Sequence, residues 1–133
     1  MNSSLLLKAF NKHFREFLED IQIVFPDDED VRSTKNALLA LQKANPKILI
    51  RVWSEYIVEK YRDQIKSNDL SFFIEKSYLC DMDNMDNARI ILDKIELLRD
   101  IVRRMSKLNQ DKIMAYIINF TKISDLYNEL SLI

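Results

Sequence analysis

The apolar residues of this chain repeat with the period of an α-helix over most of its length. In the first segment they form one stripe, made of Phe10, Phe14, Phe17, Leu18 and Ile21. Ser3 or Ser4 can cap the start of this helix. Because Pro26 disfavours a helical conformation at Phe25, we expect the helix to end near residue 24.

A second helix is predicted by the acidic run 27–30, whose negative charge is favourable at a helix N-terminus. It should end at Ala44, and its apolar face is made of Val31, Thr34, Leu38 and Leu41. Asn45 is a good N-cap, and Pro46 suits the first helical position because its missing N–H is not needed there. We therefore expect a third helix from Pro46 to about Ile65. Its buried residues should be Leu49, Val52, Trp53, Tyr56 and Ile57.

The second half of the chain predicts one short helix and two long ones. The short helix lies between Leu70 and Tyr78 and can be capped by Asn68. A long amphipathic helix is predicted from Ala88 to Met105, and Asp83 or Asn84 can cap it. The last helix can be capped by Asn109, and its apolar residues are Ile113, Tyr116, Ile117, Phe120, Ile123, Tyr127 and Leu130.

The absence of glycine agrees with a helical fold. Average usage predicts about nine glycines in a chain of this length, and there are none. Tight hairpins between strands need glycine, whereas helices are weakened by it. Since the predicted helices are joined mostly by short connections, we expect residues 1–133 to form a single all-α domain. The expected architecture is a compact bundle of five substantial helices plus one short helix. Left-handed helix ends, which usually select glycine, must use asparagine or be absent.

Composition also bounds the chemistry and the compartment. Dinucleotide fingerprints, phosphate-binding loops and nucleophile elbows all need glycine, so these classes of enzyme are excluded. The one cysteine, Cys80, cannot close an intramolecular disulfide, which suits a reducing compartment. Apolar runs are too short for a signal-peptide core or a membrane span. We therefore expect an intracellular protein that does not act at a membrane.

Charge is segregated along the chain although the formal net charge is −1. Positions 16–30 hold no basic residue and seven acidic ones: Glu16, Glu19, Asp20, Asp27, Asp28, Glu29 and Asp30. This acidic block is a candidate surface for a basic partner, or alternatively a solvated face with helix-start carboxylates. A candidate basic face is made of Arg51, Arg99, Arg103 and Arg104 from the third and fifth predicted helices. Such a face predicts association with nucleic acid as an alternative function.

Nothing in the sequence singles out a catalytic or metal site. His13 is the only histidine, which excludes sites that need two imidazoles, and we expect it to pack beside the phenylalanine stripe or to be exposed. Cys80 lacks the flanking signature of a catalytic thiol. The acidic segment 81–87 resembles a calcium loop only superficially, because the required glycine and final glutamate are missing. We therefore expect no cofactor, no metal and no enzymatic activity.

Three stretches carry a resemblance to known proteins. They are His13–Asp27 with its Val-Phe-Pro-Asp ending, Ala44–Tyr56 with Asn-Pro-Lys and Val-Trp-Ser-Glu-Tyr, and Ser71–Lys76. Together they resemble uncharacterised short helical proteins of large nucleocytoplasmic DNA viruses. The resemblance implies a viral protein in the host cytoplasm or the virion, with a structural or assembly role. It implies no activity and no functional residue.

These observations favour a non-catalytic helical interaction module that works through its faces. The candidate surfaces are the acidic block and the apolar end of the chain, and the partner would be another protein or a second copy of the chain. In a virus such a module would be a structural (virion or minor capsid) protein or an assembly adaptor.

Overall fold

The computed structural model describes residues 2–75 and 87–131. Its helices are α1 (Ser3–Val24), α2 (Glu29–Ala44), α3 (Ile48–Val52), the π-helix η1 (Trp53–Val58), α4 (Glu59–Lys66), α5 (Ser71–Glu75), α6 (Asn87–Arg103) and α7 (Lys107–Ser131). These described residues contain no strand, and the predicted all-α fold is confirmed.

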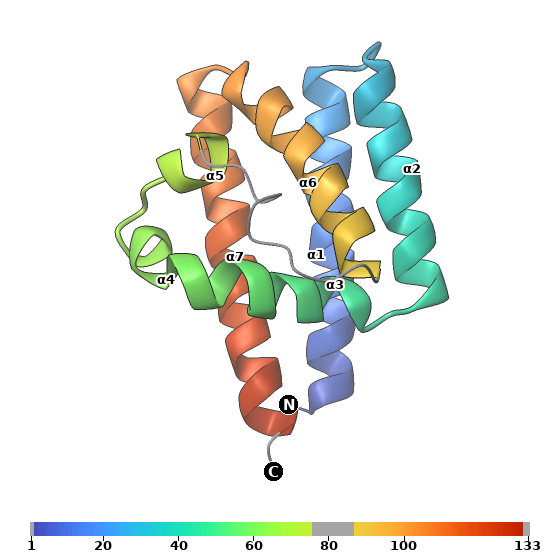
Figure 1. Cartoon of the computed structure of the whole chain (residues 1–133), viewed down its shortest axis with the longest axis vertical. Coiled ribbons are helices and arrows are strands. Elements are labelled where there is room, and N and C mark those ends of the chain that lie inside the picture. The colour runs from blue at the N-terminus through green and yellow to red at the C-terminus, as the bar shows by residue number, and fades with distance from the viewer. Residues whose placement is uncertain (1, 76–86, 132–133) are drawn as a thin grey trace.

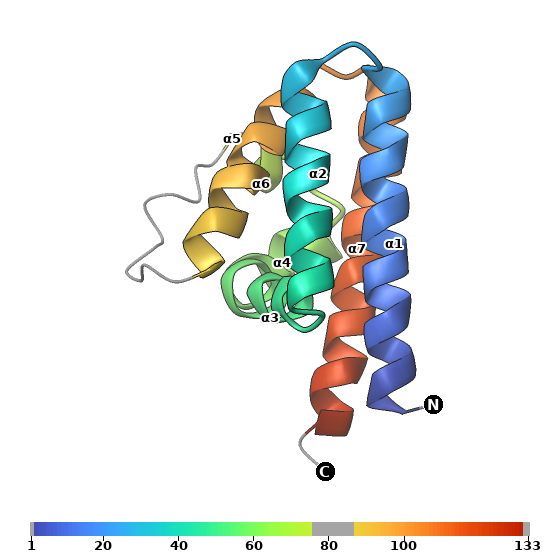
Figure 2. The same ribbon diagram turned by 90° about the vertical axis from the view of Figure 1, so that its right-hand side faces the viewer.

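Helix α1 lies between α7 and α2 in Figure 1, and Figure 2 shows that all three helices run along the long axis of the molecule. Both neighbours run antiparallel to it, so the start of α1 and the end of α7 lie at the same end of the molecule. The segment α3–η1–α4 crosses this layer at a large angle (Figure 1), and α6 packs on α2 and α3. One connected cluster of buried side chains includes residues from every helix.

The third predicted helix exists, but it is not regular. It starts at Ile48 rather than Pro46, widens into the π-helix η1, and has a non-helical backbone at Tyr61. A π turn holds more residues than an α turn, and here Trp53, Ile57 and Val58 are all buried. These three apolar residues of the irregular turn all belong to the core.

Several helix starts differ from the predicted ones by a few residues. Helix α1 is capped by Asn2, whose Oδ1 accepts a hydrogen bond from the Leu5 N–H at 2.9 Å, and not by Ser3 or Ser4. Helix α7 begins at Lys107 and is capped by Ser106, whose Oγ accepts from the N–H of the predicted cap, Asn109, at 3.2 Å. The predicted caps Asp83 and Asn84 lie outside the described residues.

Asn68 has a different role from the predicted one. Its backbone has a φ of 60°, and it ends α4 in the left-handed conformation that usually selects glycine. The cap of α5 is Asp69, whose Oδ1 accepts from the N–H and the hydroxyl of Ser71. The expectation that asparagine replaces glycine at a left-handed helix end is confirmed at this position.

Candidate interaction surface

Aromatic rings fill the seam between α1 and α7. The ring of Phe120 lies 5.4 Å from Phe10 and 5.2 Å from Phe14, measured between centroids. Phe17 and Trp53 both meet it edge-on, at 5.4 Å and 5.2 Å. The predicted phenylalanine stripe is therefore core, and its main partner is the last helix.

Several polar side chains cover this aromatic core at the seam, and two of them, His13 and Tyr116, are half-buried. The His13 ring lies 4.7 Å from the ring of Tyr116 and 5.3 Å from that of Phe120, which agrees with the expected packing beside the stripe. Tyr116 donates a short hydrogen bond from its hydroxyl to Asp20. His13 Nε2 lies 3.4 Å from the side-chain nitrogen of Asn119.

Burial shifts the pKa values of two of these groups, His13 and Tyr116. Burial lowers the pKa of His13 below its usual value, and the negative charge of Glu16 opposes this only in part. Burial also raises the pKa of Tyr116, and its hydrogen bond to Asp20 raises it further. At neutral pH the seam therefore carries a neutral imidazole and a protonated phenol.

A shallow groove runs along the outside of the seam. It consists of three successive hollows of about 190, 220 and 410 Å³. Neighbouring hollows share lining residues, namely Asp20, Lys112 and Tyr116 for the first pair and His13 and Asn119 for the second. On α1 this seam groove extends from Ile23 to Ala9, about 21 Å at the rise of an α-helix.

The helix faces that border the seam groove have the same spacing, with a large apolar residue at each end and small, polar or charged residues between. The four positions on α1 are Leu5, Lys12, Glu16 and Ile23, and those on α7 are Leu108, Ala115, Asn119 and Leu126. Both sets have the spacing 7, 4, 7, and 18 residues are five full helical turns, so each set lies on one face. The large apolar residue at each end is exposed, by 52% and 75% on α1 and by 68% and 49% on α7.

The acidic block separates into two groups. Glu16, Glu19 and Asp20 lie on α1 beside the seam groove, whereas Asp27, Asp28, Glu29 and Asp30 lie at the turn into α2. In the second group Asp28 caps α2, and its pKa is lowered mainly by the Val31 N–H and further by Arg104. Glu29 pairs with Arg32 at 2.5 Å. The second group is therefore partly occupied with starting α2, while in the first group Glu16 and Glu19 are exposed on α1 and Asp20 accepts the hydrogen bond from Tyr116.

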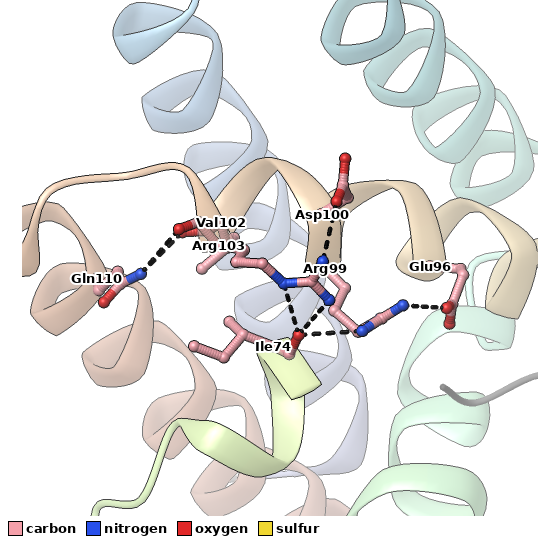
Figure 3. Close-up of polar contacts among 7 residues, drawn as sticks. All are labelled: Ile74, Glu96, Arg99, Asp100, Val102, Arg103 and Gln110. Atoms are coloured by element: carbon pink, nitrogen blue, oxygen red, sulfur yellow. Dashed lines mark hydrogen bonds and ion pairs between the residues drawn. The ribbon is translucent and has the colours of Figure 1, made fainter. Parts of the chain in front are cut away.

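The predicted basic face is largely engaged within the molecule. Arg99 and Arg103 share a face of α6, and both donate to the carbonyl oxygen of Ile74 at the end of α5, at 3.0 Å and 2.7 Å (Figure 3). Arg99 also pairs with Glu96 at 2.5 Å, and Arg103 with Asp100 at 3.3 Å. These two arginines thus hold α5 against α6.

The other two residues of the predicted basic face, Arg104 and Arg51, have different surroundings. Arg104 pairs with Asp28 at 3.4 Å, and its guanidinium lies 5.3 Å from the centre of the Phe25 ring. Arg51 is exposed on α3, where none of the described ion pairs involves it. Of the four, Arg51 is therefore the one most available to a ligand.

No family model matches this chain, and neither does any curated protein or any solved structure.

Sequence reasoning missed the polar residues that join distant helices. Gln42 is buried and donates to the backbone oxygen of Asn11 at 2.9 Å, which ties α2 to α1. Arg62 forms a double hydrogen bond with Asp125 at 2.8 and 3.0 Å, which ties α4 to α7 and raises the pKa of the arginine. Their only signal in the sequence is a polar residue at a helical position close to the apolar stripe.

The remaining candidate residues carry no site in the described part of the chain. Residues 2–75 and 87–131 contain no group of three or more potential metal ligands. Within these ranges no helix has the length and apolarity needed to cross a membrane. Cys80 and the calcium-loop-like segment 81–87 fall outside the described residues, apart from Asn87 at the start of α6.

Proposed function

We propose that this protein is a non-catalytic helical interaction module whose working surface is the outer face of α1 and α7. The partner on this face is a second copy of the chain. The observation that carries the proposal is the matched pair of exposed apolar ends, 18 residues apart on both helices. Isolated exposed apolar residues are ordinary on a protein surface, but this set is regular.

The apolar residues lie at the two ends of the antiparallel helix pair. Ile23 and Leu108 are at one end, since the hollow between α1 and α7 there is lined by Ile23, Met105 and Asn109. Leu5 and Leu126 are at the other end, one turn beyond the hollow that Ala9 and Ile123 line. A second copy placed on this face would bury both apolar pairs at once.

The two possible twofold arrangements bring different charged residues together. If α1 packs on α7 of the second copy, Ile23 meets Leu108 and, four residues further along, Glu19 lies level with Lys112. If α7 instead packs on α7, Leu108 meets Leu126, and Lys112 lies level with Lys122. In the second arrangement α1 also packs on α1, so Lys12 lies level with Glu16 and offsets part of the Lys112–Lys122 repulsion. We propose the first arrangement because it pairs Glu19 with Lys112 without setting Lys112 against Lys122. A closed twofold contact of this kind is self-complementary.

The area is sufficient for a dimer of modest affinity. Eighteen residues span about 27 Å, and two helices about 10 Å wide cover about 540 Å² on each copy. The total of about 1,080 Å² is just above the roughly 1,000 Å² expected of a specific interface. We therefore expect a concentration-dependent dimer. In a large DNA virus such a module would act as a minor virion component or an assembly adaptor.

Light scattering and sedimentation over a range of protein concentration test this proposal. The native chain should dimerise, and Ile23→Lys with Leu108→Lys should abolish dimerisation while the circular dichroism spectrum stays unchanged. Leu97→Lys is the matched control, since Leu97 is an exposed apolar residue on α6 and its replacement should leave the dimer intact. A native chain that stays monomeric, or a dimer insensitive to the paired α1 and α7 substitutions, would refute the proposal.

A further inference from the structure

We propose a second binding site, in the groove between α1 and α2, for the phosphate backbone of a nucleic acid. This basic groove is a hollow of about 630 Å³ lined by Lys8, Asn11, Lys12, Arg15, Leu39, Gln42, Lys43 and Pro46. Four of these eight residues are cations, and none is a carboxylate. It is separate from the basic face predicted on α3 and α6.

The cations of the basic groove are available to a ligand. Lys8, Lys12, Arg15 and Lys43 are all exposed, and none takes part in the ion pairs described for residues 2–75 and 87–131. Lys12 lies between the two grooves and also lines the seam groove, whereas the other three line the basic groove and none of the seam hollows. The wall contributed by α2 is itself free of negative charge after its first turn, because positions 31–54 contain five cations and no carboxylate. The local charge is therefore strongly positive, although the net charge of the chain is −1.

Polar contacts hold the two walls of the basic groove together. Asn11 Nδ2 donates to the carbonyl oxygen of Pro46 at 2.9 Å, and Gln42 Nε2 donates to the backbone oxygen of Asn11 at 2.9 Å. The cations thus project from a frame in which α1, α2 and the turn into α3 are fixed relative to one another. Because this frame is already formed, less conformational entropy is lost when several of the cations bind one ligand.

The spacing of the cations fits a row of phosphates. Lys8, Lys12 and Arg15 lie at i, i+4 and i+7 on α1 and span about 10.5 Å of the helix axis. A nucleic acid strand advances about 3.4 Å per phosphate along a duplex axis, so this row spans about three phosphate steps. Lys43 adds a fourth charge from the opposite wall of the groove.

The lining favours phosphates over an acidic peptide. Peptides dock through apolar anchors in matching pockets, whereas the basic groove offers only Leu39 and Pro46 among its cations and amides. Phosphates need only positive charge and hydrogen-bond donors. Since no aromatic residue lines the groove, bases have nothing to stack on, and we expect binding that does not depend on base sequence.

Salt dependence gives the proposal a quantitative test. Four phosphate contacts predict a slope of about −3.6 in log K against log salt for a duplex, and about −2.8 for a single strand. For a duplex the affinity should fall about 150-fold between 50 and 200 mM salt. Fluorescence anisotropy with labelled duplexes and single strands, of DNA and of RNA, measures both slopes and distinguishes these sources of the phosphate backbone.

Matched charge variants locate the site. The triple variant Lys8→Gln, Arg15→Gln, Lys43→Gln should reduce the duplex slope to about −0.9. These three residues lie away from the seam groove, so the dimer should persist in this variant and the two proposals can fail separately. The control variant Arg51→Gln, Lys66→Gln, Lys94→Gln changes the net charge equally and should keep most of the affinity.

Three results would overturn the proposal. The first is no binding of any of these nucleic acids by the native chain at low salt. The second is an equal loss of affinity in the control variant, which would indicate general charge attraction. The third is binding of a polyglutamate peptide that matches the nucleic acids in affinity and salt slope, which would assign the basic groove to an acidic protein segment instead.

Discussion

Replacement of Thr34 by valine should stabilise the protein, because its hydroxyl is buried without a hydrogen-bond partner. Thr34 is fully buried on α2, and its Oγ1 finds no partner among the described atoms. A buried hydroxyl without a partner costs about 1–3 kcal/mol, and valine replaces it with a methyl group of similar shape. Threonine and valine have similar helix propensities, so the backbone contributes little to the difference.

Thr121 is the matched control, because its buried hydroxyl is fully used. It accepts a hydrogen bond from Trp53 Nε1 at 3.3 Å and donates to the carbonyl oxygen of Ile117 at 2.9 Å. Thr121→Val leaves the Trp53 N–H unpaired in the core. This variant should therefore lose about 1–3 kcal/mol, the opposite sign from Thr34→Val.

Thermal and urea unfolding followed by circular dichroism measure both effects. The unfolding entropy of a chain this long is about 280 cal/mol/K, so 1 kcal/mol corresponds to about 4 °C in the unfolding midpoint. Thr34→Val should raise the midpoint by about 4 °C or more, and Thr121→Val should lower it by at least as much. If Thr34→Val is destabilising, its hydroxyl has a partner such as an internal water, and the reasoning is refuted.

Three further predictions follow from the core and its polar contacts. Phe120→Ala should destabilise the protein by about 3–5 kcal/mol in urea titrations, because Phe120 is fully buried among aromatic rings, and a loss below about 1 kcal/mol would contradict this packing. The lowered pKa of His13 means that the native state binds fewer protons than the unfolded chain, so stability should fall as pH drops from about 6.5 through the native pKa. His13→Phe should remove this part of the pH dependence in urea titrations; an unchanged dependence would assign it to other groups. Arg99→Met should speed amide hydrogen exchange in α5, since it removes a donor from the Ile74 carbonyl, whereas unchanged protection would show that Arg99 is not needed to hold α5.

Periodicity predicted most of the helices because their burial is one-sided. Helix α1 ends at Val24 as the constraint from Pro26 requires, and α2 ends at Ala44 ahead of Asn45–Pro46. Capping positions were less predictable. Where several capping residues lie within one turn, as at 2–4 and 106–109, the local sequence does not decide which of them takes the non-helical backbone.

The irregular parts depend on contacts that no local pattern contains. The π-helix η1 places Trp53 beside Thr121, which lies 68 residues away in the sequence. Periodicity identified Trp53 as buried, but it could not indicate which helix would meet it. The same holds for Tyr116 and Asp20, whose hydrogen bond joins α7 to α1 across the seam.

The positions of charged residues in the sequence did not indicate which of them are available at the surface or which of them lie together. Arg99 and Arg103 contribute to a basic segment, but they donate to a backbone carbonyl that composition cannot reveal. The sequence also did not predict the basic groove. Its cations come from two different helices, and only their packing brings Lys43 opposite the row on α1.

The most direct test of the proposed interaction module is to mix two charge-reversed variants. Glu19→Lys alone should be monomeric, because a twofold dimer would place the introduced ammonium group against Lys112 twice, and Lys112→Glu alone should be monomeric for the equivalent reason. Mixed in equal amounts, the two variants should form a heterodimer, since one interface then pairs the reversed charges and the other keeps the native pair. Sedimentation with one variant labelled measures this. A mixture that stays monomeric, or single variants that dimerise as well as the native chain, would contradict the packing of α1 on α7 of a second copy.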